Sequence, residues 1–259
     1  MARFPSGPTN LVYYVHMSIV GIIPARWASR RFPGKPAVAI AGVPMLQRVW
    51  EGARRSARLR DVLVATDDER IFSLCESFGA QAVMTSPRHL SGTDRIAEVA
   101  EGLTDDFVVN IQGDEPLIEP RVIDAAIEAL EGAPEADMAT VVHAAEPESL
   151  SDPNRVKVVF DGRGRALYFS RSLIPASRAP AQPNKGVWQH VGLYVYRRSF
   201  LETFVRLPPG QAEQSEGLEQ LRALENGFTI QVAIVEGWRG VSVDVPADVE
   251  SVERMLKQR

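Results

Sequence analysis

The sequence predicts an α/β fold in which a mainly parallel sheet is flanked by helices and carries a β-rich insertion. Short apolar runs alternate with stretches of helical periodicity over residues 19–130. Near residue 139 this pattern changes, and strand-like segments follow one another over residues 139–200. Charged or glycine-containing motifs directly follow several of the predicted strands. This is expected where ligands bind at the carboxyl edge of a parallel sheet.

Strands and helices can be placed in order through the first half of the chain. The predicted strands are residues 19–23, 62–65, 82–84 and 107–111. The helices between and after them show apolar residues at offsets of three, four and seven. These faces are Leu46, Val49, Trp50 and Ala53; Ile71, Leu74, Cys75 and Phe78; Ile96, Val99, Ala100 and Leu103; and Ile123, Ala126, Ile127 and Leu130. Gly79 is a helix-end signal, and Ser91 with Asp94 has capping-box spacing.

The second half predicts more strands than helices. The strands are residues 139–142, 156–160, 166–169, 190–196 and 230–235, and the helices are residues 211–226 and 246–256. A turn at residues 161–164 pairs two of these strands as a hairpin. Residues 176–186 are rich in Pro, Ala and Asn, and we expect a mobile loop there. We therefore predict a single domain over residues 18–259, with residues 139–200 as its β-rich insertion.

Composition limits the possible functions. The chain is 45% hydrophobic and 24% charged, which is ordinary for a globular protein, and its net charge of −4 argues against nucleic acid as a partner. The single cysteine rules out an intrachain disulfide, and with four histidines a structural zinc cluster is not expected. No apolar run is long enough to span a membrane, and residues 1–16 lack signal-peptide features. We expect a cytoplasmic protein whose residues 1–17 form a loose extension.

The loop after the first strand gathers four cations within ten residues, namely Arg26, Arg30, Arg31 and Lys35. Because like charges repel one another, this clustering suggests a polyanionic ligand such as a triphosphate. Gly34 allows the backbone to approach that ligand closely. The spacing is not that of the common phosphate-binding loop. The alternative is a solvated basic loop.

Two aspartates are candidates for binding Mg²⁺. Asp114 follows a buried strand, next to Glu115, and strand-end carboxylates of this kind can hold Mg²⁺ together with substrate phosphates. The alternative is a solvated turn. Asp244 precedes Pro246, and the pattern alone favours an N-cap for the last helix.

Other candidate residues give weaker signals. Ser91 and Gly92 begin a helix, whose free N–H groups and positive dipole end suit an anion or a base carbonyl. His190 and Tyr194 share one face of a strand, where packing is the usual role. Glu216, Glu219 and Gln220 fall on one predicted helical turn, where solvation is the usual role.

Taken together, these motifs resemble those of the 3-deoxy-manno-octulosonate (Kdo) cytidylyltransferases. The resemblance is colinear from about Ser18 to the end of the chain. Its principal motifs are IPARWASRRFPGK at residues 23–35, VATD at residues 64–67, HLSGTDRIAEV at residues 89–99, VNIQGDEP at residues 109–116, VKVV at residues 156–159, ALYFSR at residues 166–171, HVGLY at residues 190–194, LEQLR at residues 218–222 and VD at residues 243–244.

This resemblance implies a nucleotidyltransferase-like, Rossmann-type fold and a reaction in which CTP and Kdo give CMP-Kdo and pyrophosphate. It assigns Arg26, Arg31 and Lys35 to the triphosphate and makes Asp114 and Asp244 ligands of Mg²⁺, in place of the cap. It also implies a homodimer that pairs through the β-rich part. Residues matched to the cytosine are Ser91, Gly92 and Arg95; those matched to the sugar acid are Gln112, Arg178, His190, Tyr194, Glu219 and Gln220.

Some positions depart from the family pattern. Trp27 stands where tyrosine is common, and residues 242–246 read SVDVP where GVDTP is usual. The alternatives are therefore a cytidylyltransferase that activates another ulosonic acid or a phosphonate, and a non-catalytic nucleotide-binding protein. A missing lysine or aspartate would favour the non-catalytic protein, but Lys35, Asp114 and Asp244 are all present.

Overall fold

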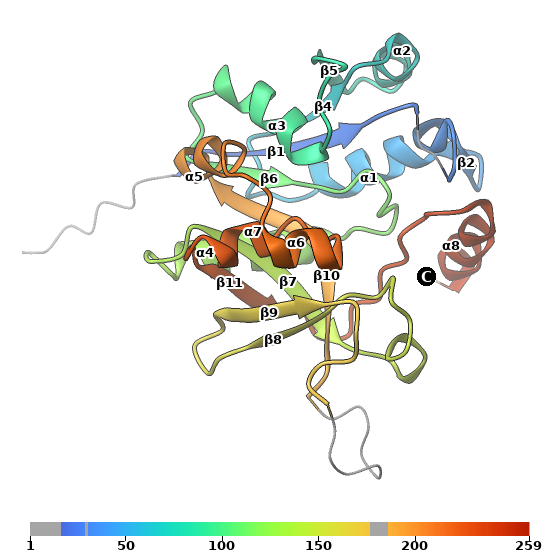
Figure 1. The fold of residues 1–259 in the computed structure, drawn as a ribbon. Helices are drawn as coiled ribbons and strands as arrows, with labels where there is room; N and C mark the ends of the chain where they lie inside the picture. Colours follow the sequence, from blue (N-terminus) through green and yellow to red (C-terminus); the bar gives the residue numbers. More distant parts are fainter. Residues whose placement is uncertain (1–16, 29–30, 177–185, 259) are drawn as a thin grey trace, which may run out of the picture.

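The sheet is built around β1 (Ile19–Ala25), whose apolar residues are almost entirely buried. The computed structural model describes residues 17–28, 31–176 and 186–258. β1 pairs in parallel with β4 (Asp61–Thr66) on one side and with β6 (Phe107–Asn110) on the other. β5 (Gln81–Met84) extends the sheet in parallel beyond β4. Because β1 and β6 run in the same direction, the loops that follow them leave the same edge of the sheet (Figure 1).

Beyond β6 the sheet becomes mixed. β10 (Trp188–Arg197) is antiparallel to both β6 and β7 (Met138–Ala144), and β11 (Ile230–Ile234) is parallel to β7. The hairpin of β8 (Lys157–Phe160) and β9 (Ala166–Ser170) joins through β8 to the start of β10. The main order is β11-β7-β10-β6-β1-β4-β5. Thus β7 and β10, which fall in the predicted β-rich segment, lie inside the main sheet.

Helices cover both faces of this sheet, as the sequence predicts (Figure 1). One face packs against α1 (Met45–Arg54), α2 (Glu69–Ser77) and α4 (Pro120–Glu131). The other packs against α3 (Gly92–Glu101), α5 (Arg198–Phe204) and α7 (Leu221–Glu225). The apolar positions at helical spacing account for the fit, since Val49, Ile71 and Ile123 are fully buried on the first face. α5 was not predicted; it begins at the residue that directly follows β10, with no turn signal between them.

The predicted single helix over residues 211–226 is wrong. The structure has α6 (Gln211–Glu216) and then α7, because Gly217 adopts the left-handed conformation with φ 61° and ends the first helix. Glu219 and Gln220 consequently lie in the connection between the two helices.

The last helix, α8 (Pro246–Gln258), packs beside the small sheet of β2 (Ala39–Ile40) and β3 (Val43–Pro44). Two short 3₁₀ turns, Lys35–Ala37 and Pro147–Ser149, complete the described elements. Within residues 17–28, 31–176 and 186–258, no helix has the length and apolar character needed to cross a membrane.

Candidate active site

Trp27, near the start of the basic loop after β1, stabilises the conformation of that loop. The backbone N–H of Gly34 donates to the carbonyl oxygen of Trp27 at 3.0 Å, and a side chain at Gly34 would meet the Trp27 ring. Gly34 has φ 72°, a conformation that favours glycine. The guanidinium of Arg70 lies 4.0 Å from the centre of the Trp27 ring and is itself paired with Asp68. The loop is therefore fixed to the start of α2. Arg30 lies outside the described residues.

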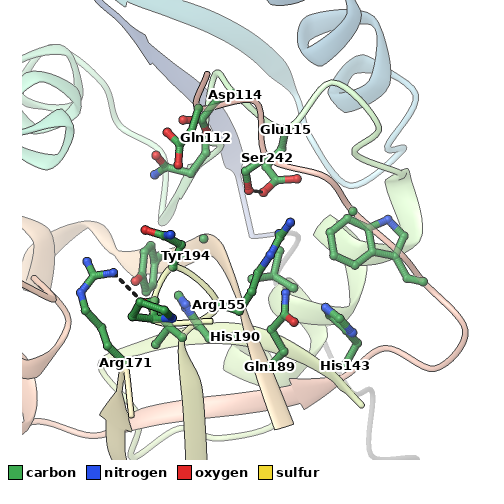
Figure 2. Close-up of a pocket in the computed structure, with 18 of the residues that line it drawn as sticks. Gln112, Asp114, Glu115, His143, Arg155, Arg171, Gln189, His190, Tyr194 and Ser242 are labelled. Atoms are coloured by element: carbon green, nitrogen blue, oxygen red, sulfur yellow. Dashed lines mark hydrogen bonds between the residues drawn. The ribbon is translucent and has the colours of Figure 1, made fainter. Parts of the chain in front are cut away.

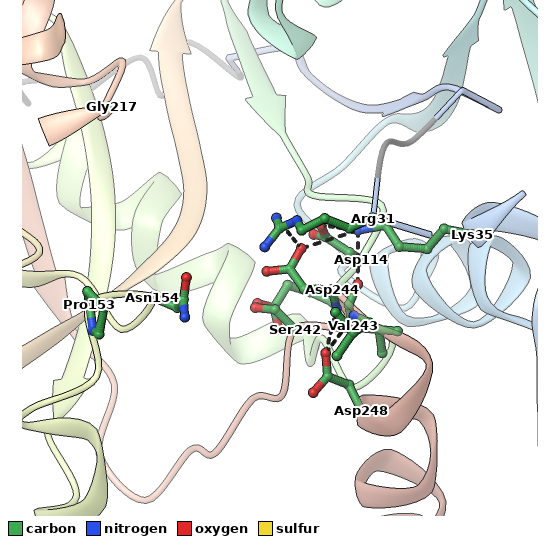
Figure 3. A network of polar contacts seen from close by, with 12 residues as sticks. Arg31, Lys35, Asp114, Pro153, Asn154, Gly217, Ser242, Val243, Asp244 and Asp248 are labelled. Carbon is green, nitrogen blue, oxygen red and sulfur yellow. Dashed lines mark hydrogen bonds and ion pairs between the residues drawn. The ribbon is translucent and has the colours of Figure 1, made fainter. Parts of the chain in front are cut away.

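Cations of this loop contact both predicted metal-binding aspartates (Figure 3). Lys35 Nζ lies 2.7 Å from Asp114 Oδ2 and 3.7 Å from Asp244 Oδ1, and it also donates to the carbonyl oxygen of Val243. Arg31 Nη2 lies 2.8 Å from the same Asp244 oxygen. Loops that follow β1, β6 and β11 thus converge on one charged cluster.

The N-cap interpretation of Asp244, taken from the pattern alone, is wrong. Its carboxylate faces Arg31 and Lys35. Asp248 accepts hydrogen bonds from the backbone N–H groups of Asp244 and Val245, at 2.7 and 2.9 Å. Asp248 therefore ties down the backbone at the start of α8 and leaves the Asp244 carboxylate free for the site.

The two aspartates fit a divalent cation. Both carboxylates lie within 3.7 Å of the single ammonium group of Lys35, so one cation can sit between them. Mg²⁺ commonly takes one or two carboxylates and completes its ligands with water and substrate phosphates. Among the described residues, no group of three or more His, Cys, Asp or Glu side chains is placed to hold a metal. A metal held here would therefore depend on the nucleotide for further ligands.

Beside this cluster is a cavity of about 700 Å³ that carries the predicted nucleotide-binding residues. They are Arg26, Arg31, Lys35, Ser91, Gly92 and Arg95. The capping box predicted at Ser91 and Asp94 is present, so α3 begins at the cavity wall. A side chain at Gly92 would lie 3.1 Å from Pro24, so glycine lets α3 start close to β1.

Arg95 faces the cavity and also stabilises its wall. It is only 4% exposed, and it donates to Thr85 Oγ1 at 2.5 Å and to Asp67 Oδ2 at 2.9 Å. Asp67 ends the VATD motif at residues 64–67 and directly follows β4. In the structure it balances the charge of a buried arginine, which holds α3 against the end of β4.

A second cavity, of about 730 Å³, opens on the other side of the aspartates (Figure 2). Gln112, His190 and Tyr194, which the resemblance assigns to the sugar acid, line this cavity together. The two cavities share Arg31, Gln112, Asp114 and Asp244. A ligand in one can therefore meet a ligand in the other at the aspartates.

His190 is a neutral acceptor in this second cavity. Thr140 Oγ donates to the carbonyl oxygen of Leu193 at 2.7 Å, so its oxygen accepts from His190 Nε2–H at 3.0 Å. This leaves Nδ1 with a free lone pair. Burial lowers the pKa of His190 to about 3 and raises that of the neighbouring Tyr194, whose ring centre lies 5.4 Å away. Both side chains are therefore uncharged partners for hydroxyl groups.

Glu219 and Gln220 are not among the described residues that line either cavity. Thr93 Oγ1 donates to Glu219 Oε2 at 2.5 Å, which ties this connection to the first turn of α3. Burial raises the pKa of Glu219. Gln220 is 4% exposed, and its Nε2 has no hydrogen-bond partner within the described part of the chain. Arg178, the remaining predicted sugar-binding residue, lies outside the described residues.

Several residues of the second cavity were missed by the sequence analysis. Ser242 Oγ donates to Glu115 Oε1, which joins the two aspartate-bearing loops. Burial raises the pKa of Glu115 to about 7. Other unpredicted lining residues include His143, Arg155, Gln189 and Trp238. No local motif marks these four, because they come from β7, the segment before β8, β10 and the loop after β11.

The fold and the site define a nucleotidyltransferase: a basic loop and two carboxylates stand at one edge of a mainly parallel sheet, between two adjoining cavities. The sequence profile of the cytidylyltransferases matches residues 20–232. A Kdo cytidylyltransferase from Solibacter usitatus is 50% identical over 240 residues, which cover 92% of this chain and 94% of that protein. An 8-amino-3,8-dideoxy-manno-octulosonate cytidylyltransferase from Shewanella pealeana is 48% identical, with coverage of 93% and 99%.

A solved structure agrees with these relatives. CMP:2-keto-3-deoxy-manno-octonic acid synthetase, complexed with CTP, matches with a TM-score of 0.86 and 41% identity over 93% of this chain and 99% of that one. The chain therefore belongs to the 3-deoxy-manno-octulosonate cytidylyltransferase family. This confirms the resemblance and the fold class predicted from the sequence.

Proposed function

We propose that this protein transfers CMP from CTP to the anomeric hydroxyl of Kdo, giving CMP-Kdo for lipopolysaccharide synthesis and releasing pyrophosphate. The observation that carries this proposal is the meeting of the two cavities at Asp114 and Asp244. CTP in the first cavity would present its α-phosphorus where a hydroxyl from the second can reach it. Relatives that are named for this reaction support the choice of substrates.

Arg26, Arg31 and Lys35 bind the triphosphate in this proposal. Positioning and charge stabilisation supply most of the catalysis of phosphoryl transfer, so these cations both hold CTP and neutralise the departing pyrophosphate. Lys35 and Arg31 are paired with Asp114 and Asp244. CTP binding therefore exchanges carboxylate partners for phosphate partners.

We further propose that Asp114 and Asp244 hold Mg²⁺. When bound, the metal would neutralise phosphate charge and lower the pKa of a coordinated hydroxyl. The aspartates themselves become available as Lys35 and Arg31 turn to the phosphates. Glu115 and Ser242 keep the two loops together while this exchange takes place.

On the nucleotide side, Ser91, Gly92 and Arg95 would contact the cytosine. On the acceptor side, Gln112, His190 and Tyr194 would read the sugar hydroxyls. We assign Arg178, Glu219 and Gln220 to the sugar acid, as the family resemblance implies.

A homodimer in the cytoplasm completes the proposal. The hairpin of β8 and β9 carries Leu167, which is 61% exposed, and the half-exposed Tyr168. Exposed apolar side chains on a hairpin suit contact with a second copy of the chain. Light scattering of the purified protein tests it, and a double change of Leu167 and Tyr168 to serine should give monomers.

Pyrophosphate release tests the activity. The assay uses CTP and Mg²⁺ with Kdo, with 8-amino-3,8-dideoxy-manno-octulosonate, and with other ulosonic acids and phosphonates in parallel, each with and without EDTA. Release with Kdo that EDTA abolishes supports the proposal. Release with the 8-amino sugar alone would assign the chain to the activity named for the Shewanella relative. CTP binding without release would favour a non-catalytic nucleotide-binding protein.

A further inference from the structure

The second cavity, which the proposed function assigns to the acceptor, contains an arginine whose ion pair within the described residues is long. Three described arginines line this cavity, Arg31, Arg155 and Arg171. Arg31 is paired with Asp244 at 2.8 Å and belongs equally to the nucleotide cavity. It is therefore already used at the junction of the two cavities.

Arg171 is committed to the framework. Its Nε donates to the carbonyl oxygen of Glu216 at 2.6 Å, and its Nη atoms donate to the carbonyl oxygens of Pro153 and Gly217 at 3.0 and 3.2 Å. These bonds hold the end of α6 against the segment before β8. Few of its N–H groups remain for a ligand.

Arg155 differs from both. Its nearest charged partner in the described chain is Asp152, whose Oδ2 lies 3.8 Å from Arg155 Nε, beyond hydrogen-bond distance. The side chain is 33% exposed, and no hydrogen bond from its guanidinium to another described residue is present. Figure 2 shows this guanidinium between Gln189 and the pair formed by Glu115 and Ser242. Its donors are thus open to the cavity.

The place of Arg155 suits one particular group of the acceptor. In a 2-keto sugar acid, the carboxylate is attached to the anomeric carbon that carries the attacking hydroxyl. The carboxylate must therefore lie beside the point of transfer, which Asp114 and Asp244 mark. Glu115 and Ser242 are close neighbours of these aspartates in the chain, and Arg155 faces them (Figure 2).

We propose that Arg155 binds the carboxylate of the acceptor and so selects a 2-keto sugar acid over an uncharged sugar. This inference rests on the proposed cytidylyltransferase function. The planar guanidinium can donate two parallel N–H···O bonds to a carboxylate, which fixes its orientation as well as its charge. The amide of Gln189, on the same wall, offers a further donor.

The test compares Arg155→Gln and Arg155→Lys with the native protein. Steady-state pyrophosphate release is measured with Kdo and with its primary amide, which has the same shape without the charge, and CTP affinity is measured by calorimetry. Arg155→Gln should lower kcat/KM for Kdo by about tenfold to a hundredfold and leave kcat/KM for the amide within about threefold. Arg155→Lys should recover part of the loss, because it restores charge without the planar fork.

Arg239→Gln is the matched control. Arg239 is 70% exposed, pairs with Glu146 at 2.9 Å and does not line the cavity, so its removal changes the net charge equally. Arg239→Gln should leave kcat/KM unchanged for both Kdo and its amide.

Equal losses with Kdo and its amide, an unchanged kcat/KM for Kdo, or weakened CTP binding in both Arg155 variants would each overturn the proposal for Arg155. If the native protein releases no pyrophosphate with any sugar acid, the proposed function fails, and the role of Arg155 fails with it.

Discussion

Lys35 Nζ lies 2.7 Å from Asp114 Oδ2, so a cation proposed to bind triphosphate and a carboxylate proposed to bind metal neutralise each other. Lys35 is also 3.7 Å from Asp244 Oδ1. Its ammonium therefore occupies the position between the carboxylates where a divalent cation would bind. In the proposed function, metal and nucleotide binding would be coupled, because CTP would draw Lys35 away from the aspartates.

The first prediction concerns Lys35→Met. Since the ammonium competes with a metal for both carboxylates, its loss should tighten binding of Mn²⁺ to the nucleotide-free protein by about fivefold or more, in the range of ordinary coupling energies. Turnover should fall by about a hundredfold or more, because a cation at the phosphates is lost. Electron paramagnetic resonance of free Mn²⁺ measures the first effect and pyrophosphate release the second.

Arg163→Gln serves as the control for Lys35→Met. Arg163 is exposed in the turn of the β8–β9 hairpin, away from the aspartates, and its replacement removes the same unit of charge. Mn²⁺ affinity that rises equally in both variants would show a general charge effect. Unchanged affinity in Lys35→Met would show that the lysine does not compete with the metal.

The second prediction separates two aspartates that stand four positions apart. Asp244→Asn should reduce kcat by about a hundredfold or more, since it removes a carboxylate from the metal site. Asp248→Asn should keep most of the activity and lower the free energy of unfolding by about 1 kcal/mol, because Asp248 accepts backbone N–H groups at the start of α8. Kinetics and urea unfolding of both variants check this. The reverse assignment of the two losses would restore the cap interpretation of Asp244.

These aspartates also show what the sequence can and cannot predict. The capping box at Ser91 was predicted correctly, because its partners are three residues apart and local in the chain. The environment of Asp244 could not be derived from pattern, since its ion pair with Arg31 joins residues 213 positions apart. Only the family resemblance indicated that Asp244 has a role other than capping the last helix.

The same contrast between local and long-range signals holds for the helices and strands. Apolar periodicity placed the helices that pack on the sheet, but it joined α6 and α7 into one helix, because Leu218, Leu221 and Leu224 after Gly217 have helical spacing. The left-handed conformation of Gly217 interrupts that helix. Arg155 and Trp238 carried no local signal at all. Their shared cavity exists only once the segment before β8, the strands β7 and β10, and the loop after β11 are assembled.

The third prediction concerns Arg70. Its guanidinium stacks on Trp27 and fixes the basic loop to α2, although it contacts neither cavity. Arg70→Gln should raise KM for CTP by about twofold to fivefold with little change in kcat, in line with a cation–π contact near the surface. Initial rates at varied CTP measure both constants. Arg54→Gln, which removes a similar contact with Trp50 on α1, is the control and should leave KM for CTP unchanged.

The last prediction is a pH dependence of stability that arises from His190. Burial lowers its pKa to about 3, whereas a histidine in the unfolded chain titrates near 6.5, so the unfolded state binds more protons between these values. Above about pH 6.5, His190 therefore does not lower the free energy of unfolding. As the pH drops from 6.5 toward 3, His190 lowers it progressively. His190→Gln keeps an N–H donor for Thr140 but cannot titrate. Between pH 6 and 4, the free energy of unfolding of His190→Gln should fall less steeply with decreasing pH than that of the native protein. The two slopes should differ by up to about 1.4 kcal/mol per pH unit.

Urea unfolding of both proteins at several pH values tests this dependence on His190. His143, whose pKa burial also lowers, should behave in the same direction when changed to glutamine. Carboxylate titration is common to all three proteins and cancels in the comparison. Parallel curves for the native protein and His190→Gln would mean that folded His190 takes up a proton over the same pH range as in the unfolded chain. In that case it could not accept a hydrogen bond from a sugar hydroxyl through Nδ1 within that acidic range.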